Sequence, residues 1–377
     1  MEGQLSFLEK TLDTKSQIVK PALSKQASKQ ASKQASKQAS KQASKQASYK
    51  NVLEQKIEDS KDILRLAAQM SKEYYHKPLI ITYSGGKDSD VLLQLAIECL
   101  APTDFEVLNS HTTVDAPETV YYIRDKFKEL EKMGIKATVQ YPHYPDGRYK
   151  SMWSLIEDKE IPPTRLARYC CAELKETSTP NRFIAVGVRE AESTGRRGRE
   201  VFATRGNNKW EAYYYYYYHV KEVFEDDVER RKSDNVDANE VGVYDCSFIA
   251  KAKKNYDLLC NPIYKWTDQE VWRFIEDRGM KHNPLYDKGF LRVGCIGCPL
   301  AGNRVTELEM YPKYKQNYIN AFERMLKKRR AKGKDDVTGK EGLHKWTDGG
   351  AVYRWWINDT SIPGQMDIYS FLNNEDE

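Results

Sequence analysis

Residues 78–89 read Pro78-Leu-Ile-Ile-Thr-Tyr83-Ser84-Gly85-Gly86-Lys87-Asp88-Ser89, and this stretch decides the fold. Its first half is a short apolar run rich in β-branched residues, which is typical of a buried strand. After the glycine pair, Val91, Leu92 and Leu95 recur at helical spacing. The sequence therefore predicts a strand, a glycine loop and a helix in immediate succession.

Strands and helices continue to alternate downstream of this loop. We expect strands near residues 105–109, 137–141 and 183–188, and a helix that opens at Pro117. A capping-box pattern predicts a further helix over residues 267–277. This alternation indicates a doubly wound, mainly parallel α/β sheet with helices on both faces. A ligand would bind at the carboxyl ends of its strands.

Three other parts of the chain stand outside this alternation. An extension over residues 1–50 contains six Lys-Gln-Ala-Ser repeats without an apolar stripe, so we expect a spacer that packs against no core. Residues 200–256 are charged and polar, with six consecutive tyrosines, and we expect a surface insertion. The insertion would interrupt a domain over residues 51–300, and residues 301–377 would form a mainly helical segment.

The overall charge gives no support for nucleic-acid binding by the folded part. The chain has 60 Lys and Arg against 55 Asp and Glu, but six of the lysines lie in the repeat, which leaves 54 basic against 55 acidic residues. No apolar run approaches the length of a membrane span, and the first residues lack the pattern of a signal peptide. We expect a cytoplasmic protein without membrane contact.

The glycine loop has the residue types of a phosphate site. Its backbone N–H groups could approach an anion closely, and the helix N-terminus adds a favourable dipole. Lys87 would add a positive charge, while Ser84 and Ser89 would add hydroxyl donors. Asp88 could orient a metal such as Mg²⁺ or the serine hydroxyls. The order of residues differs from the Walker A pattern.

The loop Ser84–Ser89 resembles the PP-loop of the adenine-nucleotide α-hydrolase superfamily, whose members bind ATP or adenylyl sulfates there. A second stretch, Gly187-Val-Arg189-Glu-Ala-Glu192-Ser193-Thr-Gly-Arg196, resembles a signature of the phosphoadenosine phosphosulfate (PAPS) reductase family. Matching stretches at 261–272 and 282–286 extend the resemblance over about residues 78–300. It implies an adenine-nucleotide α-hydrolase-like fold with ATP, adenylyl sulfate or PAPS at the loop.

The second stretch would complete the nucleotide site. Gly187 would let the backbone approach the nucleotide, and Arg189 and Arg196 could grip phosphate or sulfate through paired N–H donors. The resemblance places Ser193 in the same site. Taken without the resemblance, the stretch could equally be a solvated loop of arginine and glutamate.

Four of the seven cysteines have the spacing of a metal site. Cys170 and Cys171 are adjacent, and Cys295 and Cys298 form a Cys-x-x-Cys pair. Four thiolates could hold a [4Fe–4S] cluster or a tetrahedral zinc ion, or could be ordinary buried thiols. Similarity to the cluster-binding adenylyl-sulfate reductases favours the cluster. The other three are expected to be a core thiol and two cysteines without partner spacing: Cys99, Cys246 and Cys260.

Two stretches depart from the reductases of this family. Reductases carry a nucleophilic cysteine in a C-terminal Glu-Cys-Gly-x-His segment, whereas Glu341-Gly-Leu-His344 has none and no cysteine follows Cys298. The stretch His111–Thr119 is similar to the branch that contains the DNA-phosphorothioation sulfurtransferase. The resemblance therefore favours an ATP-dependent, sulfurtransferase-like enzyme that adenylylates an acceptor.

In that reading Lys87 and Asp88 would be the catalytic residues. The partners would be a sulfur donor or a reduced thiol protein, together with DNA or another protein as acceptor. Thiol-dependent reduction of adenylyl sulfate or PAPS to sulfite is the second reading. A non-catalytic, nucleotide-dependent interaction module with a zinc site is the third. The sequence does not indicate an oligomeric state.

Overall fold

The computed structural model describes residues 50–165, 167–176, 182–192, 201–206, 256–334, 337–338 and 344–358. The chain divides into two compact units, residues 1–58 and 59–377. A helix over residues 50–75 begins in the first unit and ends in the second. The Lys-Gln-Ala-Ser repeat, the tyrosine run, Cys246 and most of the predicted insertion lie outside the described residues.

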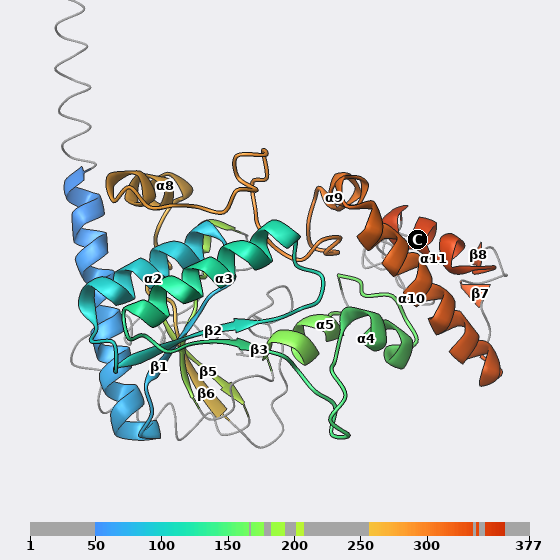
Figure 1. Cartoon of the computed structure of the whole chain (residues 1–377), viewed down its shortest axis with the longest axis horizontal. Helices are drawn as coiled ribbons and strands as arrows, with labels where there is room; N and C mark the ends of the chain where they lie inside the picture. Colours follow the sequence, from blue (N-terminus) through green and yellow to red (C-terminus); the bar gives the residue numbers. More distant parts are fainter. Residues whose placement is uncertain are drawn as a thin grey trace, which may run out of the picture. The chain divides into compact units, whose positions relative to one another are not determined.

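The second unit is built on a sheet in which the strand order is β3-β2-β1-β4-β6-β5 (Figure 1). All neighbouring strands in it are parallel except β5, which is antiparallel to β6 at one edge. The strands are β1 (Leu79–Thr82), β2 (Phe105–Ser110), β3 (Ala137–Gln140), β4 (Phe183–Ala185), β5 (Phe202–Gly206) and β6 (Tyr256–Cys260).

The order in which the chain visits these strands makes the sheet doubly wound. From β1 the chain passes through α2 (Lys87–Cys99) to β2 and then through α3 (Pro117–Lys132) to β3. It then returns past β1 to β4, continues outward to β5 at the edge, and comes back to β6, which lies between β4 and β5. The strand order thus reverses between β1 and β4, and in such sheets ligands bind at the carboxyl ends beside this point. The predicted doubly wound, mainly parallel α/β fold is confirmed.

The central strand β1 has the composition that burial on both faces requires. Leu79, Ile80 and Ile81 are all buried, as expected of a strand inside a parallel sheet. At its end, the side-chain amide of Asn109 in β2 donates to the carbonyl of Tyr83 at 2.9 Å. This bond ties the residue that precedes the glycine loop to the neighbouring strand.

Strands β5 and β6 were not predicted from the sequence. The residues of β5, Phe-Ala-Thr-Arg-Gly, show no clean alternation, because an edge strand is held by pairing with one neighbour rather than by two buried faces. In β6, Leu258, Leu259 and Cys260 are buried, but three apolar residues are too short a run to distinguish a strand from a loop. The polar stretch between them therefore connects two paired strands.

Helix α8 (Asp268–Asp277) begins where the capping box predicts. The Thr267 hydroxyl accepts a hydrogen bond from the Glu270 backbone N–H at 3.3 Å, and the Glu270 carboxylate accepts one from the Thr267 N–H at 2.7 Å. These bonds satisfy two backbone donors that a helix start would otherwise leave unpaired. The first residue of the helix proper, Asp268, takes no part in this cap.

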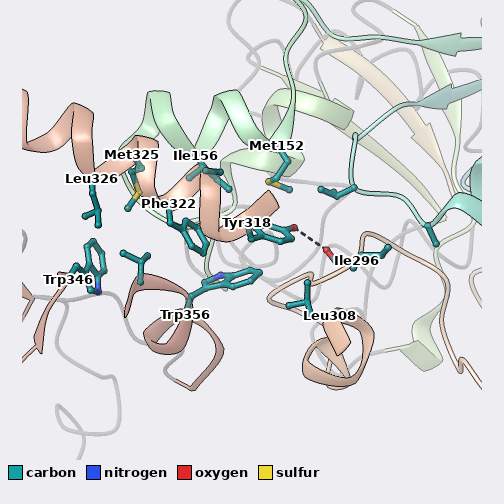
Figure 2. Close-up of a cluster of buried hydrophobic side chains, with 14 of the residues drawn as sticks. Met152, Ile156, Ile296, Leu308, Tyr318, Phe322, Met325, Leu326, Trp346 and Trp356 are labelled. Atoms are coloured by element: carbon teal, nitrogen blue, oxygen red, sulfur yellow. Dashed lines mark hydrogen bonds between the residues drawn. The ribbon is translucent and has the colours of Figure 1, made fainter. Parts of the chain in front are cut away.

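The C-terminal helices share one hydrophobic cluster with the rest of the second unit. Its buried members come from residues 114–156, from residues 285–296 and from the C-terminal segment, so no separate C-terminal core exists among the described residues. Figure 2 shows Tyr318, Phe322 and Trp356 at its centre. The helices involved are α4 (Met152–Lys159), α9 (Arg304–Met310), α10 (Pro312–Ala331) and α11 (Gly349–Asn358).

Two features complete the fold. A short helix, α5 (Tyr169–Cys171), runs directly into a π-helical turn at Ala172–Glu176. A small hairpin pairs β7 (Val337–Thr338) with β8 (His344–Lys345). Across the described part of the chain, every helix is too short or too polar to cross a lipid bilayer.

Candidate functional site

The glycine loop lies between β1 and α2, as predicted, and its shape depends on Gly85. This residue has φ of +72°, in the left-handed region where a side chain is unfavourable. A Cβ atom there would also lie 2.9 Å from Cγ1 of Ile123 in α3. The loop can therefore pass close over α3 only because position 85 is glycine.

The Ser89 hydroxyl stabilises the backbone conformation of the loop through hydrogen bonds. It accepts from the backbone N–H of Ser84 at 3.3 Å and of Gly86 at 3.2 Å, and it donates to the Gly86 carbonyl at 2.7 Å. Ser89 is buried, whereas the Ser84 side chain is exposed. Ser89 thus organises the loop backbone. That either hydroxyl binds phosphate stays a prediction.

Two cations and two carboxylates meet beside the loop. Arg189 Nε donates to Asp88 Oδ1 at 2.5 Å, and Arg189 Nη2 donates to Asp268 Oδ1 at 2.9 Å. Lys87 Nζ lies 3.0 Å from the same Asp268 oxygen and 3.5 Å from Asp88 Oδ2. The Lys87 and Arg189 side chains are 6% and 3% exposed, so both cations are desolvated and need these partners.

Asp268 differs from the other three members of this group. Its side chain is 61% exposed, whereas that of Asp88 is 17% exposed. Its partial burial alone would raise the pKa of its carboxyl. The hydrogen bond and charge of Lys87 and the charge of Arg189 outweigh that effect and lower the pKa below its usual value. Asp268 is therefore a carboxylate at neutral pH.

Gly187 lets the end of β4 approach the loop closely. A Cβ atom there would lie 3.1 Å from the Asp88 carbonyl oxygen and 3.3 Å from the Ser89 backbone nitrogen. A larger residue would push Arg189 away from the loop. In the structure, Gly187 therefore permits close contact between two segments of the protein, the chain that follows β4 and the glycine loop. Ser193 and Arg196, the other two predicted residues of this stretch, lie outside the described residues.

Residues 283–286 contact the loop from far along the chain. The Asn283 amide, fully buried, donates to the Gly85 carbonyl at 2.9 Å and to the Thr119 hydroxyl at 3.1 Å. The Tyr286 hydroxyl accepts from the Lys87 backbone N–H at 2.9 Å. Sequence reasoning quoted this stretch but assigned it no contact with the loop, and it missed Asp268 altogether.

A buried carboxyl lies directly behind the loop. Asp90, in the first turn of α2, accepts from the Tyr83 hydroxyl at 2.6 Å and lies 3.1 Å from the Tyr122 hydroxyl. Burial raises its pKa to about 7, although hydrogen bonds from both tyrosines and the charges of Lys126 and His282 lower it. Asp90 thus faces the protein interior, among the side chains of Tyr83 and Tyr122.

Three of the four predicted metal-ligating cysteines gather around one tyrosine. Burial raises the pKa of the Tyr318 hydroxyl, and the charges of Cys295, Cys170 and Cys298 raise it further. Cys295 and Cys170 are partly buried against the hydrophobic cluster of the C-terminal helices. Cys171, next to Cys170, is buried. The structure thus brings the two distant cysteine pairs to one region of the chain.

The Cys-x-x-Cys turn is held by the C-terminal helices. The Gly297 backbone N–H donates to Glu307 in α9 at 3.1 Å, and the Tyr318 hydroxyl in α10 donates to the Ile296 carbonyl at 3.0 Å, the dashed line in Figure 2. Gly297 has φ of +70°, and a Cβ atom there would lie 3.2 Å from Trp356 in α11. Tyr318 and Trp356, which pack in the cluster of the C-terminal helices, thus also position this turn.

The four cysteines Cys170, Cys171, Cys295 and Cys298 have the chemistry that a thiolate-bound metal group requires. They offer four thiols, with the cations of Lys175 and Arg304 near Cys295 and Cys298 to offset negative charge. Burial raises the pKa of the Cys295 thiol, which a bound metal would reverse. Within the described ranges, however, no three Cys, His, Asp or Glu side chains stand close enough together to hold a metal ion.

A family model decides the relationship of this chain to known proteins. Residues 78–301, which contain the loop, the Arg189 stretch and all four cysteines, match the phosphoadenosine phosphosulfate reductase domain. The chain belongs to the phosphoadenosine phosphosulfate reductase family. The predicted family is therefore confirmed, whereas the narrower assignment to the DNA-phosphorothioation branch stays a prediction.

The proteins to which this chain is similar match it over different lengths. An uncharacterised protein of Methanocaldococcus jannaschii is 24% identical over 79% of this chain. The aligned part covers 59% of the length of that protein. An adenosine 5'-phosphosulfate reductase of Staphylococcus epidermidis is 35% identical over 14% of this chain and 21% of its own. A crystal structure of Candida glabrata FMN adenylyltransferase aligns at 14% identity and a TM-score of 0.36, covering 65% of this chain and 64% of that one.

Proposed function

We propose that this chain binds ATP or an adenylyl sulfate at the Ser84–Ser89 loop and uses it in sulfur transfer, by adenylylating an acceptor. The observation that carries the proposal is the pair of buried cations, Lys87 and Arg189, beside a glycine loop at the switch point of the sheet. Buried cations at a helix N-terminus are suited to a polyphosphate. Family membership makes an adenine nucleotide the natural ligand.

In this reaction the acceptor attacks the α-phosphorus of ATP. A bond forms between the acceptor atom and phosphorus, the bond from the α-phosphorus to the bridging oxygen breaks, and pyrophosphate leaves with the electron pair. Lys87 and Arg189 would stabilise the charge that develops on the leaving pyrophosphate. Asp88, which pairs with both, would keep them oriented. A nucleotide-bound Mg²⁺ would add further positive charge.

We propose that Cys170, Cys171, Cys295 and Cys298 hold a [4Fe–4S] cluster. Bound there by all four thiolates, a cluster would supply a redox-active group of iron and sulfide. The chain's own contribution is to fix the Cys-x-x-Cys turn through Glu307 and to exclude water around it with the aromatic cluster of the C-terminal helices. A tetrahedral zinc ion is the alternative occupant.

The match to adenosine 5'-phosphosulfate reductases favours a second candidate function. In that reaction a reduced thiol protein would supply two electrons, and the products would be sulfite and AMP. No cysteine stands between Cys298 and residue 377, so the attacking thiol would come from elsewhere. Release of sulfite in the presence of a reduced thiol protein would support this candidate over adenylylation.

The first test follows pyrophosphate release from labelled ATP in the presence of trial acceptors. We expect release to fall on the order of 100-fold in Lys87→Ala. That substitution removes a buried positive charge that would stabilise the leaving pyrophosphate. Lys72→Ala is the matched control, since Lys72 forms an exposed ion pair with Asp104. Equal release from both variants would contradict the proposed site. Nucleotide binding without turnover would favour a non-catalytic module.

The second test concerns the cysteines. Protein purified without oxygen should be brown and contain about four iron and four sulfide ions per chain. Cys295→Ser should lose most of this iron, whereas Cys260→Ser, a buried cysteine in β6, should retain it. A colourless protein with one zinc ion per chain would overturn the cluster assignment and leave the nucleotide site unaffected.

A further inference from the structure

Asp268 occupies a position that a nucleotide phosphate would need. One of its oxygens, Oδ1, accepts from Arg189 Nη2 at 2.9 Å and lies 3.0 Å from Lys87 Nζ. A phosphate oxygen bound between Lys87 and Arg189 would accept hydrogen bonds from these same two cations. The ion pairs of Asp268 therefore occupy the same donors, Lys87 and Arg189, that the proposed nucleotide would use.

The charges of this group cancel while Asp268 is in place. Lys87 and Arg189 are matched by Asp88 and Asp268, which leaves no net positive charge among these four side chains. A polyphosphate entering this group would meet two carboxylates at close range. Once Asp268 moves away, one net positive charge remains to attract the phosphate.

Exposure determines which carboxylate can leave. Asp88 is 17% exposed and lies within the loop, whereas Asp268 is 61% exposed and projects from the first turn of α8. Moving Asp268 into water costs its own carboxylate little, because most of that side chain is already hydrated. An incoming phosphate would replace it as the partner of Lys87 and Arg189. The start of α8 does not depend on it, since Thr267 and Glu270 form the cap.

Arg189 keeps its orientation without Asp268. Its Nε still donates to Asp88, and its Nη1 lies 3.4 Å from the Trp266 carbonyl. The atom that Asp268 releases is Nη2, and Lys87 Nζ is released with it. Displacement of one exposed side chain therefore presents two preoriented donors to a phosphate.

We infer that Asp268 is a tethered competitor for the phosphate of the nucleotide: it closes the site by pairing with Lys87 and Arg189, and it is displaced when phosphate binds. This inference rests on the proposed nucleotide function and assigns the control of affinity to a residue outside the loop. The pairing lowers the affinity for free anions and protects two buried cations when no ligand is present.

The test measures binding of inorganic pyrophosphate to the full chain by calorimetry, with EDTA and again with Mg²⁺. Asp268→Asn keeps the shape of the side chain and removes its charge. We expect the affinity for pyrophosphate to rise about tenfold at low ionic strength, as expected for one partly exposed charge, and the gain to shrink in high salt. Asp277→Asn, at the other end of α8, makes the same charge change away from the site and should bind as wild type does.

Thermal unfolding gives an independent reading of the same variant. Without ligand, Asp268→Asn should melt below wild type, because Lys87 and Arg189 lose a partner. With saturating pyrophosphate, its melting temperature should rise by more than that of wild type. A residue with only a structural role would lower both values without increasing the ligand-induced rise.

Three outcomes would overturn the inference. Unchanged pyrophosphate affinity in Asp268→Asn, with normal binding by wild type, would remove the competition and leave the nucleotide function standing. A loss of affinity confined to the samples with Mg²⁺ would make Asp268 a metal ligand instead. Absence of pyrophosphate and ATP binding by both wild type and variant would overturn this inference together with the proposed function.

Discussion

Asp90 shows how strongly the environment of one residue can shift its chemistry in this fold. Its carboxyl is 2% exposed and lies between the hydroxyls of Tyr83 and Tyr122. Tyr122 has one hydroxyl proton but two acceptors within reach, Asp90 Oδ2 at 3.1 Å and the Lys281 carbonyl at 2.9 Å. A protonated Asp90 could donate to Tyr122, which frees the Tyr122 proton for Lys281. The geometry is therefore best satisfied when Asp90 is neutral.

This arrangement predicts a pH-dependent contribution to stability. An unfolded aspartate has a pKa of about 3.9, whereas burial raises that of Asp90 to about 7. The folded chain therefore holds the proton to higher pH, so the contribution of Asp90 is fully present below about pH 4 and is lost as the pH rises through about 7. We expect Asp90→Asn to gain about 2 kcal/mol relative to wild type between pH 5 and pH 7.

Denaturant unfolding at a series of pH values checks this prediction. Asp125→Asn is the matched control, because Asp125 is exposed and pairs with Lys128 on the surface of α3. Its unfolding free energy should follow that of wild type at every pH. Parallel curves for Asp90→Asn and wild type would show that Asp90 is already ionised in the folded chain.

At the scale of elements, the contact between α10 and α11 depends on one glycine. A Cβ atom on Gly349 would lie 2.3 Å from the Ile319 carbonyl oxygen and 2.8 Å from the Glu323 nitrogen, both backbone atoms of α10. The Gly349 N–H also donates to the Glu323 carboxylate at 2.6 Å. The first turn of α11 therefore packs backbone against backbone, which fixes the position of Trp356 further along the helix.

Gly349→Ala should destabilise the chain by about 1–3 kcal/mol, because the two helices must move apart. Gly350→Ala offers a matched control, since its Cβ would meet only the side chains of Asp348 and Arg354, which can move. Both substitutions gain similar helix propensity, so the difference between them isolates the collision. Unfolding free energies that agree for the two variants would show that α10 and α11 separate without cost.

At the scale of the whole molecule, the C-terminal helices share a hydrophobic core with α4 and with the segments near residues 114–116 and 285–296. Their buried side chains pack in one cluster with Val114, Ile156, Leu285 and Ile296. Burying a large apolar side chain contributes about 1.5–3 kcal/mol. The total stability of a domain is about 5–15 kcal/mol. The seven large side chains that this segment supplies are Leu308, Tyr318, Phe322, Met325, Leu326, Trp346 and Trp356.

A chain that ends at residue 302 should therefore fail to unfold cooperatively, because the loss of seven such side chains is comparable with its whole stability. Deletion of the repeat at residues 25–48 is the control, since it contains no apolar residue larger than alanine. That deletion should leave the melting temperature within a few degrees of wild type. A cooperative transition in the truncated chain would instead support an independent C-terminal domain.

Local pattern was enough to predict the parts of the fold in which neighbouring residues act together. The apolar run before Tyr83, the proline that opens α3 and the capping box of α8 each predicted an element that the structure confirms. The phosphate-type loop and the family followed from contiguous residues as well. Strands β5 and β6 escaped prediction because their stability comes from pairing with a distant partner rather than from their own sequence.

The sequence by itself determined the strand, glycine loop and helix at residues 79–99, the alternation that makes the sheet parallel, and the residue types of the site. Only the tertiary structure decided that Asp268 pairs with Lys87 and Arg189 and that Tyr286, 199 positions from Lys87, accepts its backbone N–H. Periodicity is a property of residues close along the chain, whereas these contacts depend on which elements the strand order brings to the same edge of the sheet.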